Sequence, residues 1–149
     1  MHRGNICRSP FAFELFSKIS NEKGLTDVNA DSAGLLALPG NSATHMAQRV
    51  ASEYEVDLTA HKAKTLSKEL LSWSDIILVM EKSQLDTLVT DFPEAKGKTF
   101  LMRHFAGTGG KDRGIADPYG FQYEAYRFCY VDIEDAVSGL IKHIVSLQH

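Results

Sequence analysis

The chain has 149 residues, with 16 lysines and arginines against 19 aspartates and glutamates, for a formal net charge of -3 at pH 7. Hydrophobic residues make up 44% of it and charged residues 23%, which is typical of a globular domain and not of a disordered chain. Because the charge balance is mildly acidic, composition gives no case for a general DNA or RNA binder. We expect one domain over residues 1–149, large enough to bury a single core.

The two cysteines, Cys7 and Cys129, are too few for a disulfide-stapled secreted scaffold or a structural zinc site. A reducing cytoplasmic location is therefore expected. The longest apolar run, residues 76–80, has the length of a strand and falls far short of the ~20 residues of a membrane span. No membrane insertion is expected.

The first predicted helix follows a short opening loop. Ser9 is the expected N-cap, Pro10 occupies the first helical position, and Gly24 fits the C-terminal stop. Residues 26–33 are then predicted to form a strand.

The middle of the chain alternates helices and strands. Helices are predicted over residues 42–54, 67–73 and 82–90, and strands over residues 75–80 and 98–102. The continuous apolar character of residues 75–80 favours a strand of a parallel sheet that is covered on both faces.

A glycine-rich stretch over residues 107–114 leads to the last predicted helix, residues 122–147. Cys129 lies on the apolar stripe of that helix and is expected to be a core thiol. The alternation of strands and helices predicts a three-layer α/β domain with a parallel sheet.

Residues 4–10, Gly-Asn-Ile-Cys-Arg-Ser-Pro, carry the most chemical information. A short loop that runs into a helix start converges its amide hydrogens on one point, where the helix dipole favours an anion. Arg8 can hold two phosphate oxygens at once, which lysine cannot do. Taken alone, the segment is equally consistent with an ordinary turn before a capped helix.

This segment resembles the phosphate-binding loop of low-molecular-weight protein tyrosine phosphatases, whose pattern is Cys, five residues, Arg, then Ser or Thr. Four later segments match that family in the same order, so that the similarity covers nearly the whole chain. They are residues 31–35, 59–64, 75–80 and 117–119.

The apolar residues 35–40, which contain no Trp, and Glu81-Lys82 are similar to the bacterial branch of the family, which is associated with exopolysaccharide-regulating tyrosine kinases. The resemblance implies a three-layer α/β/α fold with a parallel, flavodoxin-like four-stranded sheet. It also implies a phosphotyrosine-containing protein as partner, with a bacterial tyrosine kinase as one candidate, and neither a metal nor any other cofactor.

By the same resemblance, the reaction is hydrolysis of phosphotyrosine through a phosphocysteine intermediate. Arg8 would hold the equatorial phosphate oxygens, Asp117 would protonate the leaving oxygen, and Tyr119 would form a wall for the tyrosine ring. The phosphate-contacting residues would be Arg3, Gly4, Asn5, Ile6, Cys7, Arg8 and Tyr119, and the loop-supporting residues would be Asn5, Ser9, Ser32 and His61.

The chain departs from the family pattern at the nucleophile. Six residues before Arg8 stands His2, where the family has Cys, and Cys7 occupies the place of a second, backup thiol. The family also has an apolar strand before this loop, so we expect Met1 to be a truncated or misassigned start. Histidine is a known covalent nucleophile, but beside a free N-terminus His2 is not expected to be held in line.

Two rival functions and one rival residue remain. Because the loop has no thiol at position 2, the chain is also consistent with a non-catalytic module that binds phosphate or phosphotyrosine. A thiol-dependent arsenate reductase needs two further cysteines, and only Cys129 is available. Asp112 is an alternative acid, although it lacks the Pro-Tyr that follows Asp117.

Overall fold

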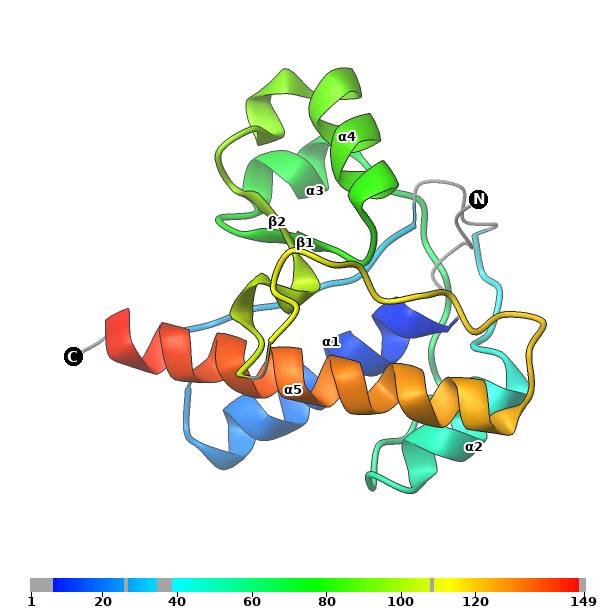
Figure 1. Cartoon of the computed structure of the whole chain (residues 1–149). Coiled ribbons are helices and arrows are strands. Elements are labelled where there is room, and N and C mark those ends of the chain that lie inside the picture. Colours follow the sequence, from blue (N-terminus) through cyan, green and yellow to red (C-terminus); the bar gives the residue numbers. More distant parts are fainter. Residues whose placement is uncertain (1–6, 26, 35–38, 108, 148–149) are drawn as a thin grey trace.

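A computed structural model describes residues 7–25, 27–34, 39–107 and 109–147 of the chain. Figure 1 shows two short strands with α3 and α4 on one side and α1 and α5 on the other, so the predicted α/β class with helices on both faces of a sheet is confirmed. In chain order the elements are α1 (Arg8–Glu22), α2 (His45–Ser52), α3 (Lys68–Trp73), β1 (Ile77–Val79), α4 (Lys82–Asp91), the 3₁₀ turn η1 (Pro93–Ala95), β2 (Thr99–Leu101), the 3₁₀ turn η2 (Met102–Phe105) and α5 (Tyr123–Leu147).

The sheet is parallel, as predicted, but small. β1 and β2 pair with Ile77 opposite Thr99 and Val79 opposite Leu101, and α4 makes the crossover between them. The described ranges contain these two strands and one isolated parallel bridge, between Gly34 and Thr65. The expected four-stranded sheet is therefore not found among them, and a strand before Gly4 would fall outside the described residues.

The prediction of a strand over residues 26–33 is wrong for the part that the structure describes. Residues 27–33 form no ladder, and only Gly34 makes a bridge. These residues and residues 76–80 line the same cavity of about 490 Å³. A strand needs a neighbour at hydrogen-bonding distance, and here open space takes the neighbour's place.

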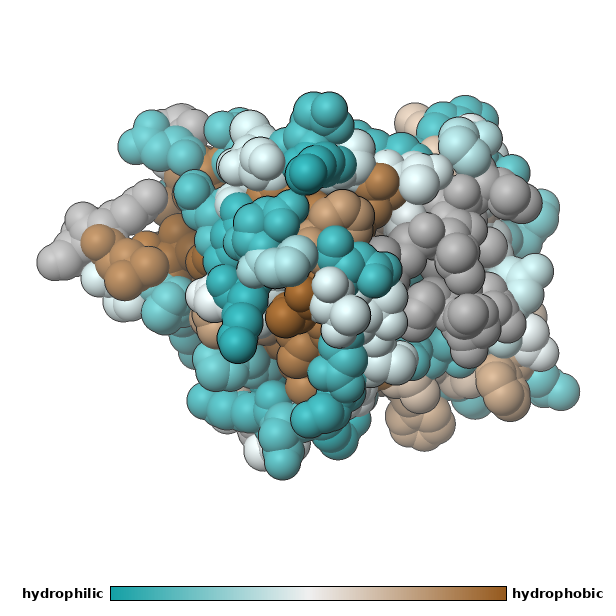
Figure 2. Space-filling view, turned by 90° about the horizontal axis from the view of Figure 1, so that it is seen from above, coloured by the Kyte–Doolittle hydropathy of each residue, from teal (hydrophilic) through white to brown (hydrophobic). Residues whose placement is uncertain are grey.

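The predicted burial of residues 75–80 on both faces is also too high, since all three residues of β1 are only half-buried. Looking down on the side of α3 and α4, Figure 2 shows a band of hydrophobic residues between hydrophilic ones. Apolar side chains are thus incompletely covered on this side of the molecule.

Helix ends follow the sequence signals in most places. Ser67 caps α3 by accepting from the Leu70 N–H, and Gly24 ends α1 with a φ of 71°. The expected cap at Ser9 is wrong: α1 begins at Arg8, with Cys7 as its N-cap and no capping side chain. No described helix combines the length and apolar character needed to cross a membrane.

The main core lies between α1, α2 and α5. Phe11 of α1 stacks on Tyr130 of α5 with ring centroids 3.9 Å apart and an interplanar angle of 1°, and both side chains are fully buried. Such ring contacts add to the area buried in fixing how two helices meet. A smaller cluster of Leu71, Leu88 and Ala95 covers the other side of the strands.

α5 and η2 approach each other closely at Gly139. A Cβ added at Gly139 would stand 1.6 Å from the Phe105 carbonyl oxygen. Only glycine allows α5 and η2 this approach, because its hydrogen leaves room for the carbonyl.

We expect Gly139→Ala to lower the free energy of unfolding by about 1–3 kcal/mol, the usual range for an overpacked site. Urea denaturation measures this, with Gly109→Ala as control because an added Cβ there meets nothing within 4 Å. The gain in helix propensity from alanine offsets only part of the clash. Equal unfolding free energies in Gly139→Ala and the unmutated chain would show that α5 and η2 are not in close contact.

Candidate functional site

Arg8 is the buried cation of the site. Its side chain is 5% exposed, and its NH1 donates to Glu81 Oε1 at 2.5 Å and to the Ile115 carbonyl at 2.6 Å. A buried charge needs partners of opposite sign and good hydrogen bonds. The guanidinium thus joins the first turn of α1 to the end of β1 and to the segment that leads to α5.

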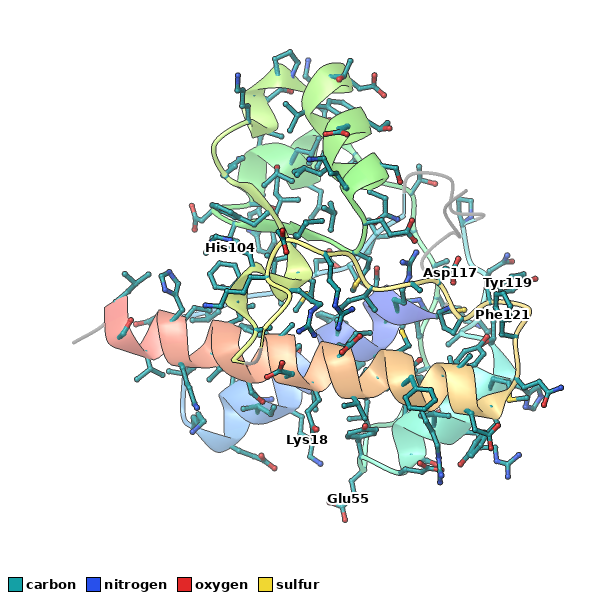
Figure 3. The ribbon with its side chains drawn as sticks, viewed as in Figure 1. Lys18, Glu55, His104, Asp117, Tyr119 and Phe121 are labelled. Atoms are coloured by element: carbon teal, nitrogen blue, oxygen red, sulfur yellow. The ribbon has the colours of Figure 1, made fainter. Side chains whose placement is uncertain are left out.

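Asp117 approaches the same guanidinium from that segment, with its Oδ2 3.9 Å from Arg8 NH2. Its Oδ1 accepts the Tyr119 N–H at 3.0 Å, which ties the carboxylate to the turn behind it. Figure 3 shows Asp117, Tyr119 and Phe121 together on the stretch before α5. Tyr119 is 44% exposed and Phe121 67% exposed, so two aromatic rings stand open to solvent near the carboxylate.

The segment before Asp117 is anchored at several points. The Ile115 N–H donates to the Met80 carbonyl at 2.7 Å, and a Cβ on Gly114 would lie 2.8 Å from that oxygen. Arg103, 2% exposed, donates to the Gly110 carbonyl at 3.1 Å and to Asp132 of α5 at 3.0 Å. Asp117 is thereby carried by a loop fixed to both β1 and α5.

The cavity described above reaches this group. Arg8, Ser9, Ser32 and Asp117 lie on its wall together with Cys7, and most of its remaining lining is apolar. Its lining therefore combines a cation and a carboxylate with apolar side chains, among them those of β1.

The Cys7 thiol lies next to Arg8 in sequence but faces the core. It is 2% exposed, and its Sγ lies 3.5 Å from the Tyr126 hydroxyl and 3.9 Å from Thr44 Oγ1. Burial raises the pKa of this thiol, and its hydrogen bonds with Tyr126 and Thr44 offset the effect only in part. A thiol held in this way is mainly protonated at neutral pH and is a poor nucleophile.

The structure brings together Arg8 and Asp117 and places Ser9 and Ser32 on the same cavity wall. Asp112 is exposed, whereas Asp117 is the acid that approaches Arg8. His61 lies near Glu14 of α1, whose carboxyl it influences electrostatically. The other predicted loop residues lie outside the described residues: His2, Arg3, Gly4, Asn5 and Ile6.

Sequence reasoning missed Glu81 as a site residue. Its signal was available, because it follows a predicted parallel strand, and the carboxyl ends of parallel strands are where α/β folds gather functional groups. The hydroxyls of Thr44, Tyr126 and Tyr130 around Cys7 were also missed. Their positions on amphipathic helices gave no signal beyond core packing.

Among the residues that the structure describes, no three His, Cys, Asp or Glu side chains are grouped so as to hold a metal ion. The chemistry that Arg8 and Asp117 can support is binding of an anion at the guanidinium and proton transfer by the neighbouring carboxyl.

The chain is similar to known bacterial phosphatases. The chain is 36% identical over 145 residues to a protein-arginine-phosphatase of Geobacillus stearothermophilus, covering 97% of this chain and 93% of the relative. It is 38% identical over 133 residues to the probable low molecular weight protein-tyrosine-phosphatase AmsI of Erwinia amylovora, covering 89% and 86% of the two.

A solved structure of Vibrio vulnificus Wzb in complex with benzylphosphonate matches with a TM-score of 0.83 and 36% identity, over 95% of this chain and 94% of that one. These relatives are bacterial, which confirms the expected likeness to the bacterial branch. The family model described as low molecular weight phosphotyrosine protein phosphatase matches residues 1–148. The chain belongs to this family of hydrolytic enzymes.

Proposed function

We propose that this chain removes phosphate from phosphotyrosine in proteins, with the phosphoryl group bound at Arg8 and the leaving oxygen protonated by Asp117. The observation that carries the proposal is the approach of these two side chains, 3.9 Å apart, on the wall of one cavity. The guanidinium would hold the equatorial oxygens as negative charge spreads over them. After the phosphoryl group has been transferred to a nucleophile of the chain, the Asp117 carboxylate would take a proton from the water that attacks phosphorus and releases the phosphate.

The exposed aromatic surface beside Asp117 supports phosphotyrosine as the substrate. Tyr119 stands two residues after Asp117 with 44% of its surface exposed, where it could flank the ring of a phosphotyrosine. We further propose that residues 1–149 act as one domain in the cytoplasm, with a bacterial tyrosine kinase among its phosphorylated partners.

Phosphoarginine is the second candidate substrate, since one relative is named a protein-arginine-phosphatase. Release of phosphate from a phosphotyrosine peptide and from a phosphoarginine peptide of the same flanking sequence tests the choice. We expect the larger kcat/KM for phosphotyrosine. A larger value for phosphoarginine would overturn the substrate assignment and leave the roles of Arg8 and Asp117 standing.

The nucleophile is the second part of the proposal. His2 stands six residues before Arg8, where the family pattern has a thiol, and Cys7 directly precedes Arg8. The burial of the Cys7 thiol and its raised pKa support a structural role for it. We therefore propose that the chain binds the phosphoryl group well but hydrolyses it slowly.

Replacing His2 by a thiol tests this directly. We expect His2→Cys to raise the rate of p-nitrophenyl phosphate hydrolysis by ~10²-fold or more, because a thiolate would then stand at the nucleophile's position. His143→Cys, which adds a thiol at an exposed position of α5, is the matched control. A fast rate in the unmutated chain that His2→Cys does not increase would contradict the proposal.

Arg8→Lys keeps the charge but loses the planar fork. We expect inorganic phosphate and vanadate to bind ~10–100-fold more weakly, the equivalent of one charge-assisted hydrogen bond of ~1.5–3 kcal/mol. Titration calorimetry measures this, and Arg49→Lys at an exposed position of α2 controls for the substitution itself. Equal oxyanion affinity in Arg8→Lys and the unmutated chain would remove Arg8 from the site.

Asp117→Asn removes the proposed acid without changing its shape. In the His2→Cys background we expect hydrolysis of a phosphotyrosine peptide to slow by ~10²-fold or more. The effect should be much smaller for a substrate whose leaving group needs no proton. A larger defect from Asp112→Asn would show that the other carboxylate is the acid.

A further inference from the structure

Two tyrosines of α5 contact the residue that precedes Arg8. The Tyr130 hydroxyl donates to the Cys7 carbonyl at 2.7 Å. Tyr130 is fully buried, and its ring is clamped against Phe11 in the stack described above. The stacked ring thus fixes the position of the Tyr130 hydroxyl, which contacts the residue next to Arg8.

The second contact is a triangle of three polar atoms. The Tyr126 hydroxyl lies 3.5 Å from Cys7 Sγ and 3.2 Å from Thr44 Oγ1, and the sulfur lies 3.9 Å from that same oxygen. Thr44 also caps α2, because its Oγ1 accepts the Ala47 N–H at 3.1 Å. The triangle connects α1, α2 and α5 at the start of α1.

The carbonyl contact has a consequence for the neighbouring amide. The peptide unit between Cys7 and Arg8 is planar, and in the trans form its C=O and N–H point in opposite directions. When Tyr130 draws the Cys7 carbonyl into the core, the Arg8 N–H must point the other way. That N–H belongs to the first turn of α1, where amides have no partner within the helix and can face an anion.

We propose that Tyr130 and Tyr126 are positioning residues for the phosphate site. Tyr130 orients the Cys7–Arg8 peptide unit, and with it the first amide of α1, while Tyr126 together with Thr44 keeps the Cys7 side chain turned into the core. Neither tyrosine touches the phosphoryl group. The inference rests on the proposed function, since it takes the start of α1 as the place where phosphate binds.

The chemistry of both hydroxyls suits this role. Burial raises the pKa of Tyr126 and of Tyr130, so both remain protonated over the working range of pH. A buried neutral hydroxyl needs a hydrogen-bond acceptor for its O–H group. For Tyr130 this acceptor is the Cys7 carbonyl.

The first test uses Tyr130→Phe, which deletes the hydroxyl and keeps the ring on Phe11. We expect the full chain to bind inorganic phosphate ~10-fold more weakly by titration calorimetry, at a temperature where both proteins are folded. Tyr123→Phe, on the same helix, is the matched control, because Tyr123 contacts Arg49, Arg127 and the main core through its ring. A lower melting temperature with unchanged phosphate affinity would mean that the hydroxyl only stabilises the fold, and would overturn the inference.

The second test uses Tyr126→Phe and the alkylation of thiols by iodoacetamide in the native chain. We expect Cys7 to react at least ~10-fold faster in this variant while Cys129 keeps its rate. Cys129 is an internal control because it lies on the same helix and is 5% exposed. Equal acceleration of both thiols would indicate opening of α5. No acceleration of the Cys7 reaction would show that Tyr126 does not hold Cys7. Either result would overturn the positioning role of Tyr126.

The two proposals fail in different ways. An unmutated chain that binds no phosphate would overturn the proposed function, while the ratio of Cys7 to Cys129 alkylation would still decide whether Tyr126 holds the thiol. Phosphate binding that is equally strong in the unmutated chain and in Tyr130→Phe would leave the proposed function standing and overturn the positioning role alone.

Discussion

The burial of one positive charge at the start of α1 constrains much of this structure. Arg8 is 5% exposed and stands at the end of the helix where the backbone dipole is already positive. Such a charge is tolerable only with anionic and carbonyl partners close by. Glu81 comes from the end of β1, and the Ile115 carbonyl and Asp117 come from the segment before α5. The guanidinium therefore draws together parts of the chain that are far apart in sequence.

Several close contacts outside this cluster also fix the positions of Arg8 and of the segment that carries Asp117. Gly114 allows its segment to lie against the Met80 carbonyl, which puts the Ile115 carbonyl within reach of Arg8. Arg103 ties the start of that segment to α5 through Asp132. Because α5 also holds Cys7 through Tyr130, one helix supports both the cation and the loop that carries the acid. The site is thus built on packed elements, although the acid itself stands on a loop.

Helices and strands that depend on local sequence could be predicted. Helices α3, α4 and α5 and strands β1 and β2 lie within two residues of their expected ends, because apolar periodicity and capping residues act over a few positions. The pairing of Arg8 with Asp117 followed from family resemblance. Residues 27–33 failed as a strand because pairing depends on a neighbour that local sequence does not specify. Glu81 and Tyr130 contact Arg8 and Cys7 across 73 and 123 positions. The place of Glu81 after a strand marks it as a candidate site residue, but no local pattern pairs it with Arg8.

The way in which Arg8 is held would also let it bind the phosphate of the proposed function while it stays buried. Glu81 and the Ile115 carbonyl both accept from NH1, so two bonds to one nitrogen fix the plane of the guanidinium. NH2 points toward Asp117 at 3.9 Å, beyond ordinary hydrogen-bond distance, so a phosphate oxygen could take this donor without breaking either bond at NH1. A lysine side chain ends in a single ammonium nitrogen instead of a planar guanidinium. It would have to give up its hydrogen bonds to Glu81 and Ile115 in order to bind the anion. In the proposed function, Arg8 would hold the fold together through NH1 and offer NH2 to the substrate.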